Sequence, residues 1–185
     1  DSSVSLMEEL ISNPLGFPLL SVVVFIPLAG ALVLWLAYLV GTREEQLKWI
    51  ALSATLVGFL VSLPIYFLFD STTPAMQFKE QYSWIATFNI HYTLGVDGIF
   101  LLLVLMTTLL SPICVLCSWR AIENRVMEFM VSLLLMETAM LGVFMALDFV
   151  LFYVFWEAML IPMYLIIGVW GGPNRLYAAI KFFLY

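Results

Sequence analysis

Five long apolar runs constrain what this chain can fold into. They occupy about residues 17–40, 47–69, 98–119, 126–147 and 149–169. About 20 helical residues cross the 30 Å core of a bilayer, and in lipid only helices and closed barrels satisfy all of their backbone polar groups. The sequence therefore predicts an all-α integral membrane protein, a polytopic helix bundle with five complete transmembrane helices.

The composition supports this class. Of the 185 residues, 64% are hydrophobic and 11% are charged, whereas a soluble domain has about 45–50% apolar and about 25% charged residues. The net charge of -6 falls mostly in short connections and in the first residues, so it does not indicate a nucleic-acid partner.

A sixth apolar run begins at about residue 176 and reaches the last residue, Tyr185. Ten residues are too few to cross a bilayer, so we expect this helix to be the start of a sixth span and the chain to be a fragment. Residues 1–13 carry three acids and no base, and we expect them to form an exposed acidic tail ahead of a membrane part over residues 14–185.

Basic residues flank alternate connections. Six of them lie beside the first, third and fifth connections, against Lys79 alone in the others. The six are Arg43, Lys48, Arg120, Arg125, Arg175 and Lys181. Because cytoplasmic loops are enriched in Lys and Arg, we expect the amino terminus on the periplasmic or outer side.

The long connection between the second and third spans has a two-residue period. From Tyr82 to Val96 the even positions are mostly apolar and the odd positions mostly polar, which predicts an extended strand or hairpin over about 82–96 on the outer face of the membrane. His91 lies on the polar side of this pattern. It is interpreted either as a solvated surface residue or as a proton-exit or partner contact.

Cys114 and Cys117 form a C-x-x-C motif inside an apolar run. A zinc site needs further ligands, and a redox motif needs a βαβ context and access to water. We therefore expect two reduced thiols in helix packing, with no metal site and no redox centre.

Glu157 is the only charge between residues 149 and 169, and it would lie near the bilayer midplane. An acid there costs about 2.5–3.5 kcal/mol on insertion scales and commonly marks an ion or proton pathway. Glu157 is therefore the first candidate for proton translocation. Pro162, five residues later, would loosen the backbone close to it.

Glu137 is a second acid within a span. Glu137 lies eleven residues before Asp148, and Glu157 lies nine residues after Asp148. A tight turn at Asp148 would therefore place both carboxyl groups at a similar depth, about 13–17 Å from the turn. The pair is interpreted as a proton relay, or Glu137 is a protonated acid that bonds to a hydroxyl or carbonyl group. Lys181 is a supporting candidate, but it lies near the end of its span, so the cationic partner of Glu157 is expected in another segment or subunit.

Four runs of sequence resemble a known family. They are VFWEAMLIPMYLIIGVWGG at 154–172, RLYAAIKFFLY at 175–185, GVDGIFLLLVLMTTLLSP at 95–112 and GVFMALDFVLFYVFWE at 142–157. They resemble the antiporter-like M subunits of the proton-pumping NADH:quinone oxidoreductase, respiratory complex I, which are equivalent to subunit four of the mitochondrial complex. The resemblance covers about residues 14–185.

The resemblance implies a fold of about fourteen helices with two inverted repeats, of which this chain would be the first third. Glu157 matches a glutamate that pairs with a lysine on a later helix, Glu137 an acid on the preceding helix, and Lys181 a lysine on the following one. The extended segment matches a hairpin that clasps neighbouring subunits.

The function implied is proton pumping coupled to quinone reduction elsewhere in the complex. The expected partners are protons, the lipid bilayer and the other membrane subunits, in a bacterial inner membrane or a mitochondrial inner membrane. FMN, iron–sulfur clusters and quinone are expected in other subunits and no cofactor in this chain. Two alternatives stay open: a subunit of a multisubunit cation/proton antiporter or membrane-bound hydrogenase, and a structural membrane subunit without conduction.

Overall fold

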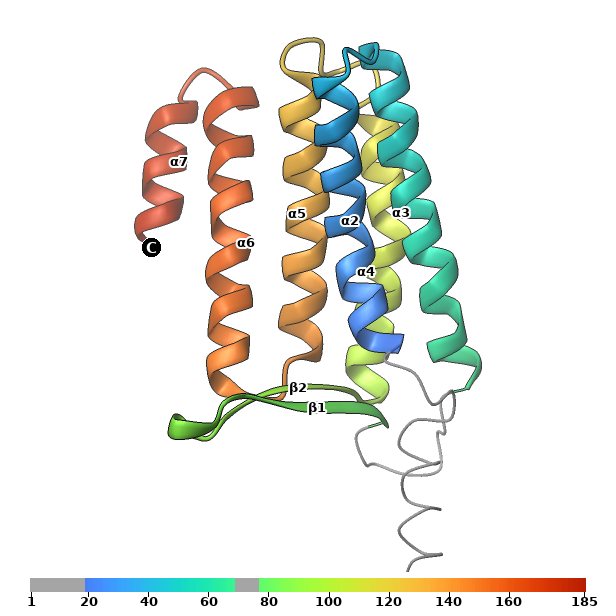
Figure 1. Ribbon diagram of the computed structural model, residues 1–185. Coiled ribbons are helices and arrows are strands. Elements are labelled where there is room, and N and C mark those ends of the chain that lie inside the picture. The colour runs from blue at the N-terminus through green and yellow to red at the C-terminus, as the bar shows by residue number, and fades with distance from the viewer. Residues whose placement is uncertain (1–18, 69–76) are drawn as a thin grey trace, which may run out of the picture.

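The computed structural model describes residues 19–68 and 77–185. The predicted acidic tail at residues 1–13 lies outside the described residues. Most of the described chain is helical (Figure 1). The helices are α2 (Leu19–Leu39), α3 (Glu44–Phe67), α4 (Gly98–Cys117), α5 (Val126–Met145), α6 (Phe149–Trp170) and α7 (Arg175–Leu184).

Five helices in the described part of the chain, α2 to α6, are long and apolar enough to cross a membrane. The prediction of a multi-pass helical membrane protein is therefore confirmed. The second helix begins at Glu44, a few residues before the predicted start. Its first turn contains Glu44 and Glu45, and acids are favourable there because the amino end of a helix carries a partial positive charge.

Helix α5 lies at the centre of the bundle, where it contacts α2, α3, α4 and α6 (Figure 1). It is also the most buried of the five spans, whereas α6 is the least buried. Small residues let helices approach closely: a Cβ added to Gly30 of α2 would lie 2.5 Å from the Cβ of Ala54 on α3. Helix α7 packs against α6 (Figure 1).

The two ends of the bundle differ in composition. The α2–α3, α4–α5 and α6–α7 connections lie together at one end (Figure 1). This end carries Arg43, Lys48, Arg120, Arg125 and Arg175, and we call it the basic end. Lys48 of α3 joins this helix to the α4–α5 connection, because its ammonium group donates a hydrogen bond to the carbonyl oxygen of Trp119.

At the opposite end, strands β1 (Gln77–Ile85) and β2 (Ile90–Val96) pair antiparallel. They are joined by a short 3-10 turn over residues 86–88 and by Asn89, whose φ of 54° is left-handed. The two strands cross the ends of the helices (Figure 1). Strand β2 is tied to the α5–α6 turn by the Leu147 amide, which donates to the Thr93 carbonyl at 2.9 Å. The side of the membrane on which this hairpin lies stays a prediction.

Candidate functional site

Glu137 is buried inside the bundle on α5. Its side chain is 2% exposed, and its Oε1 lies 3.9 Å from the position that a Cβ on Gly58 of α3 would occupy. It lines a cavity of about 250 Å³ together with polar side chains of two other helices. These are Thr55 of α3 and Thr107, Ser111 and Cys114 of α4. The carboxyl group therefore faces α3 and α4.

Several polar atoms of this site lack a hydrogen-bond partner of ordinary geometry within residues 19–68 and 77–185. Among the described residues, neither carboxylate oxygen of Glu137 makes a hydrogen bond of ordinary geometry, and the same holds for the Thr138 hydroxyl. The Ser111 hydroxyl, in the same cavity, donates to the Thr107 carbonyl at 2.9 Å. A buried polar group without a partner is unfavourable, whereas a volume of 250 Å³ has room for several waters at about 30 Å³ each. The surroundings of Glu137 suit a hydrated carboxyl group.

Glu157 lies on a different face of the structure. Two residues before it, Phe155 of α6 packs into α5 at Gly142, where an added Cβ would lie 2.3 Å from the Phe155 ring. Two residues correspond to about 200° around a helix, so Glu157 points away from α5 and is exposed in this chain. Tyr153, one turn earlier, has its hydroxyl within hydrogen-bonding reach of the Glu157 carboxylate.

The face of α6 that carries Glu157 is also the face that meets α7. Tyr164 follows Glu157 by two turns and contacts Phe183 of α7, with ring centroids 5.3 Å apart and the ring planes tilted by 57°. One turn further, a Cβ on Gly168 would lie 3.5 Å from the Cβ of Ala179. Glu157 thus continues the α7-facing stripe towards the hairpin end.

Glu137 and Glu157 lie at a similar depth along their helices, but they lie on different faces of the bundle. Each lies eight residues from its end of the α5–α6 turn, which is about 12 Å at 1.5 Å per residue. Glu137 points into the α3–α4 side of the bundle, whereas Glu157 points away from it. The structure does not bring the two carboxyl groups together.

The two supporting residues have distinct places. Lys181 lies on α7 with its ammonium group 5.7 Å from the centroid of the Tyr177 ring. The Gly168–Ala179 and Tyr164–Phe183 contacts place Lys181 level with about residue 166 of α6, roughly 13 Å along the helix from Glu157. Pro162 is buried, and α6 is continuous through it from Phe149 to Trp170.

Asp148 caps α6 and also ties this helix to the hairpin. Its Oδ1 accepts hydrogen bonds from the amides of Val150 at 2.9 Å and Leu151 at 3.3 Å, which caps α6. Its Oδ2 accepts from the His91 amide at 3.2 Å, and this bond is the main cause that lowers the pKa of Asp148. An aspartate directly before an apolar run is a capping signal in the sequence, but the contact with β2 is not readable there. The His91 ring lies 2.9 Å from the Asn89 side-chain oxygen.

Cys114 and Cys117 are free thiols and both are exposed. Cys114 nevertheless lines the cavity between α3, α4 and α5, so the expected packing between helices is wrong only for Cys117. Over the described ranges, no group of three or more His, Cys, Asp or Glu residues could hold a metal ion.

A bundle of apolar helices with a carboxyl group in the middle of α5 and another in the middle of α6 is a polytopic membrane protein. Residues 146–185 match the transmembrane family described as NADH:quinone oxidoreductase/Mrp antiporter. The chain is 52% identical over 169 residues to NADH-quinone oxidoreductase subunit M of Rhodobacter capsulatus, covering 90% of this chain and 32% of the relative. It is 42% identical over 167 residues to NADH-ubiquinone oxidoreductase chain 4 of Arabidopsis thaliana, covering 90% and 33%.

Solved structures have the same arrangement of helices. A chain of respiratory complex I from Thermus thermophilus with bound NADH matches with a TM-score of 0.72 and 28% identity, over 90% of this chain and 32% of that one. A chain of a membrane-bound sulfane sulfur reductase matches with a TM-score of 0.69 at 20% identity, over 88% and 24%, which shows a shared fold. The resemblance to the M-subunit family is thereby confirmed, and the chain spans about a third of the length of the curated relatives it matches.

Proposed function

We propose that this chain acts within a proton-translocating membrane subunit of NADH:quinone oxidoreductase, respiratory complex I, next to other antiporter-like subunits. The observation that supports it most is Glu157, a carboxyl group in the middle of a 22-residue apolar helix, in a chain 52% identical to a subunit M. An acid in such a span is unfavourable unless it has a function or a partner. Quinone reduction elsewhere in the complex would provide the free energy, since moving one proton against 100 mV requires about 2.3 kcal/mol.

In this proposal Glu157 binds and releases a proton as its pairing with a cationic group changes. Its exposed position on α6 leaves the carboxyl group open to a segment or subunit that packs there. Lys181 is about 13 Å away along the helix, so we assign it a supporting role near the basic end rather than the pairing role. Pro162 supports the site because proline has no backbone N–H. The backbone carbonyl group one turn earlier in α6 therefore lacks its helical hydrogen bond.

Glu137 would act separately, as a carboxyl group that exchanges protons with water in the cavity between α3, α4 and α5. The Phe155 ring fills the α5–α6 contact at Gly142, between the faces that carry the two acids. A proton would therefore pass from one acid to the other around this contact rather than across it. The basic end would face the cytoplasm or matrix, with the amino terminus and the hairpin on the outer side, because five basic residues gather at that end.

The test uses the full-length protein in its assembled membrane complex, with Glu157→Gln and Glu157→Ala. We expect NADH-driven proton uptake into vesicles to fall at least about tenfold, since loss of a proton-transferring group commonly reduces rates by 10² or more. Glu128→Gln is the matched control, because Glu128 is an exposed acid in the first turn of α5. Normal proton pumping by the Glu157→Gln protein would contradict the proposal and favour a structural subunit without conduction.

A second candidate is a subunit of a multisubunit cation/proton antiporter, because the matched family includes the Mrp antiporters. The two are distinguished by the driving force. Proton movement that depends on Glu157 and is driven by an imposed Na⁺ gradient, without NADH, would favour the antiporter. Movement that requires NADH oxidation would favour the oxidoreductase.

A further inference from the structure

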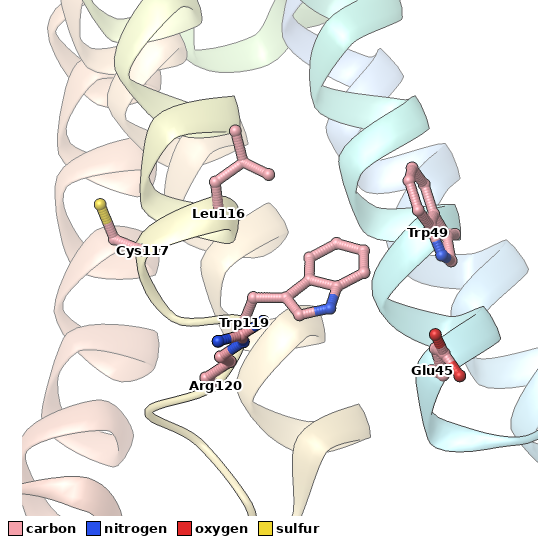
Figure 2. Close-up of a pocket in the computed structure, with 6 residues that line it drawn as sticks. All are labelled: Glu45, Trp49, Leu116, Cys117, Trp119 and Arg120. Carbon is pink, nitrogen blue, oxygen red and sulfur yellow. The ribbon is translucent and has the colours of Figure 1, made fainter.

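A second cavity lies at the basic end, between the first turns of α3 and the last turn of α4 (Figure 2). Its volume is about 430 Å³, and it is separate from the cavity at Glu137. Its lining residues are Glu45 and Trp49 of α3, Leu116 and Cys117 of α4, and Trp119 and Arg120 of the following connection. Neither intramembrane acid is among them.

Aromatic side chains fix the wall of this cavity. The indoles of Trp49 and Trp119 meet edge to face, with centroids 5.1 Å apart and an interplanar angle of 76° (Figure 2). Lys48 also contacts Trp119, since its ammonium group donates to the Trp119 carbonyl and lies 6.0 Å from the ring centroid. Tryptophans at the ends of membrane spans lie at the level of the lipid headgroups.

The cavity carries one charge of each sign. Glu45 and Arg120 both line it, and within the described part of the chain the side chain of neither forms an ion pair or a hydrogen bond. A carboxylate and a guanidinium group that share a cavity in this way suit a ligand with both a cationic and an anionic group. Apolar surface continues from the cavity along α4, where Ile113 is 44% exposed and Leu116 is 55% exposed.

From this arrangement we propose that the cavity binds the headgroup of a zwitterionic phospholipid, phosphatidylethanolamine. The lipid phosphate pairs with Arg120, whose planar guanidinium group suits phosphate. The ethanolamine ammonium donates hydrogen bonds to Glu45, and the acyl chains lie along Ile113 and Leu116. A choline headgroup fits less well because its trimethylammonium group has no N–H to donate. This site does not depend on the proposed proton transfer.

The test measures which lipids the full-length protein retains in its assembled complex. The complex is stripped of loose lipid in detergent and exchanged into nanodiscs with equal amounts of phosphatidylethanolamine, phosphatidylcholine and phosphatidylglycerol, and bound lipids are counted by native mass spectrometry. The unsubstituted protein should retain phosphatidylethanolamine over the other two. Glu45→Gln should lower that retention about threefold to tenfold and leave phosphatidylglycerol unchanged, whereas Arg120→Gln should lower both.

Arg43→Gln and Glu44→Gln are the matched controls, since both residues are exposed neighbours that do not line the cavity. Glu45→Asp keeps the charge and should retain phosphatidylethanolamine, which separates ligand binding from a purely structural role. Equal lipid retention in Glu45→Gln, Arg120→Gln and the controls would overturn the proposal. Preference of the unsubstituted protein for phosphatidylglycerol would overturn it as well, since the site would then bind anionic lipid.

Discussion

Replacing Gly142 with alanine tests the close approach of α5 and α6, which decides where Glu157 points. A Cβ at position 142 would lie 2.3, 2.4 and 2.5 Å from three ring atoms of Phe155, and the Phe155 side chain is only 8% exposed. Ordinary van der Waals contacts of a Cβ are 3.4–4 Å. The ring, or α6 as a whole, must therefore move by about 1 Å to admit one methyl group, since a close-packed interior has few voids to absorb it.

The magnitude follows from two opposing effects. Overpacking of a well-packed contact costs about 1–3 kcal/mol, while alanine is favoured over glycine inside a helix by about 0.5–1 kcal/mol. We expect the free energy of unfolding to fall by about 1–2 kcal/mol, which changes the folded-to-unfolded ratio about 5- to 30-fold. A shift of α6 would also move Glu157, so Gly142→Ala should reduce proton transfer as Glu157→Gln does, and it should reduce stability in addition.

The assay is reversible unfolding of the full-length protein by SDS in mixed micelles, followed by circular dichroism. Gly58→Ala is the matched control, because its Cβ would make only ordinary contacts, 3.7 Å from Ile26 and 3.9 Å from Glu137. A second substitution, Phe155→Leu, should restore part of the stability lost in Gly142→Ala by removing the ring. If Gly142→Ala were as stable as Gly58→Ala, the close α5–α6 contact inferred here would be refuted.

Two further predictions concern Glu137 and Asp148. Glu137→Leu should raise the free energy of unfolding by about 1–3 kcal/mol in the same assay, because it removes a buried carboxyl group whose oxygens make no hydrogen bond of ordinary geometry with the described residues; a loss of stability would mean that this carboxyl group is well satisfied. The His91 amide lowers the pKa of Asp148, so ionised Asp148 should stabilise the contact with the hairpin at any pH above the ordinary pKa of a carboxyl group. This stabilisation should be lost as the pH falls through the lowered pKa. Hydrogen exchange of the His91 amide, corrected for its intrinsic rate, should therefore accelerate at acidic pH, whereas in Asp148→Ala it should be fast throughout; pH-independent protection in the unsubstituted protein would contradict this.

The spans were predictable because their signal is local. Apolar runs of sufficient length fixed the position of each helix to within a few residues, and Asp97 and Asp148 cap α4 and α6 at the predicted starts. The sequence also indicated that Glu137 and Glu157 would lie at a similar depth, since depth depends only on the number of residues from the turn. The contact of Asp148 with β2 was not predictable, because it joins residues 57 positions apart.

The amino-acid sequence by itself determined the class of protein, the number and length of the apolar helices, and the two acids within them. The tertiary structure decided which way those acids point. In lipid, a helix that is apolar on all sides carries no pattern that distinguishes a neighbouring helix from the bilayer. Its rotation is set by contacts such as Phe155 against Gly142, and this contact turns Glu157 away from the cavity that holds Glu137.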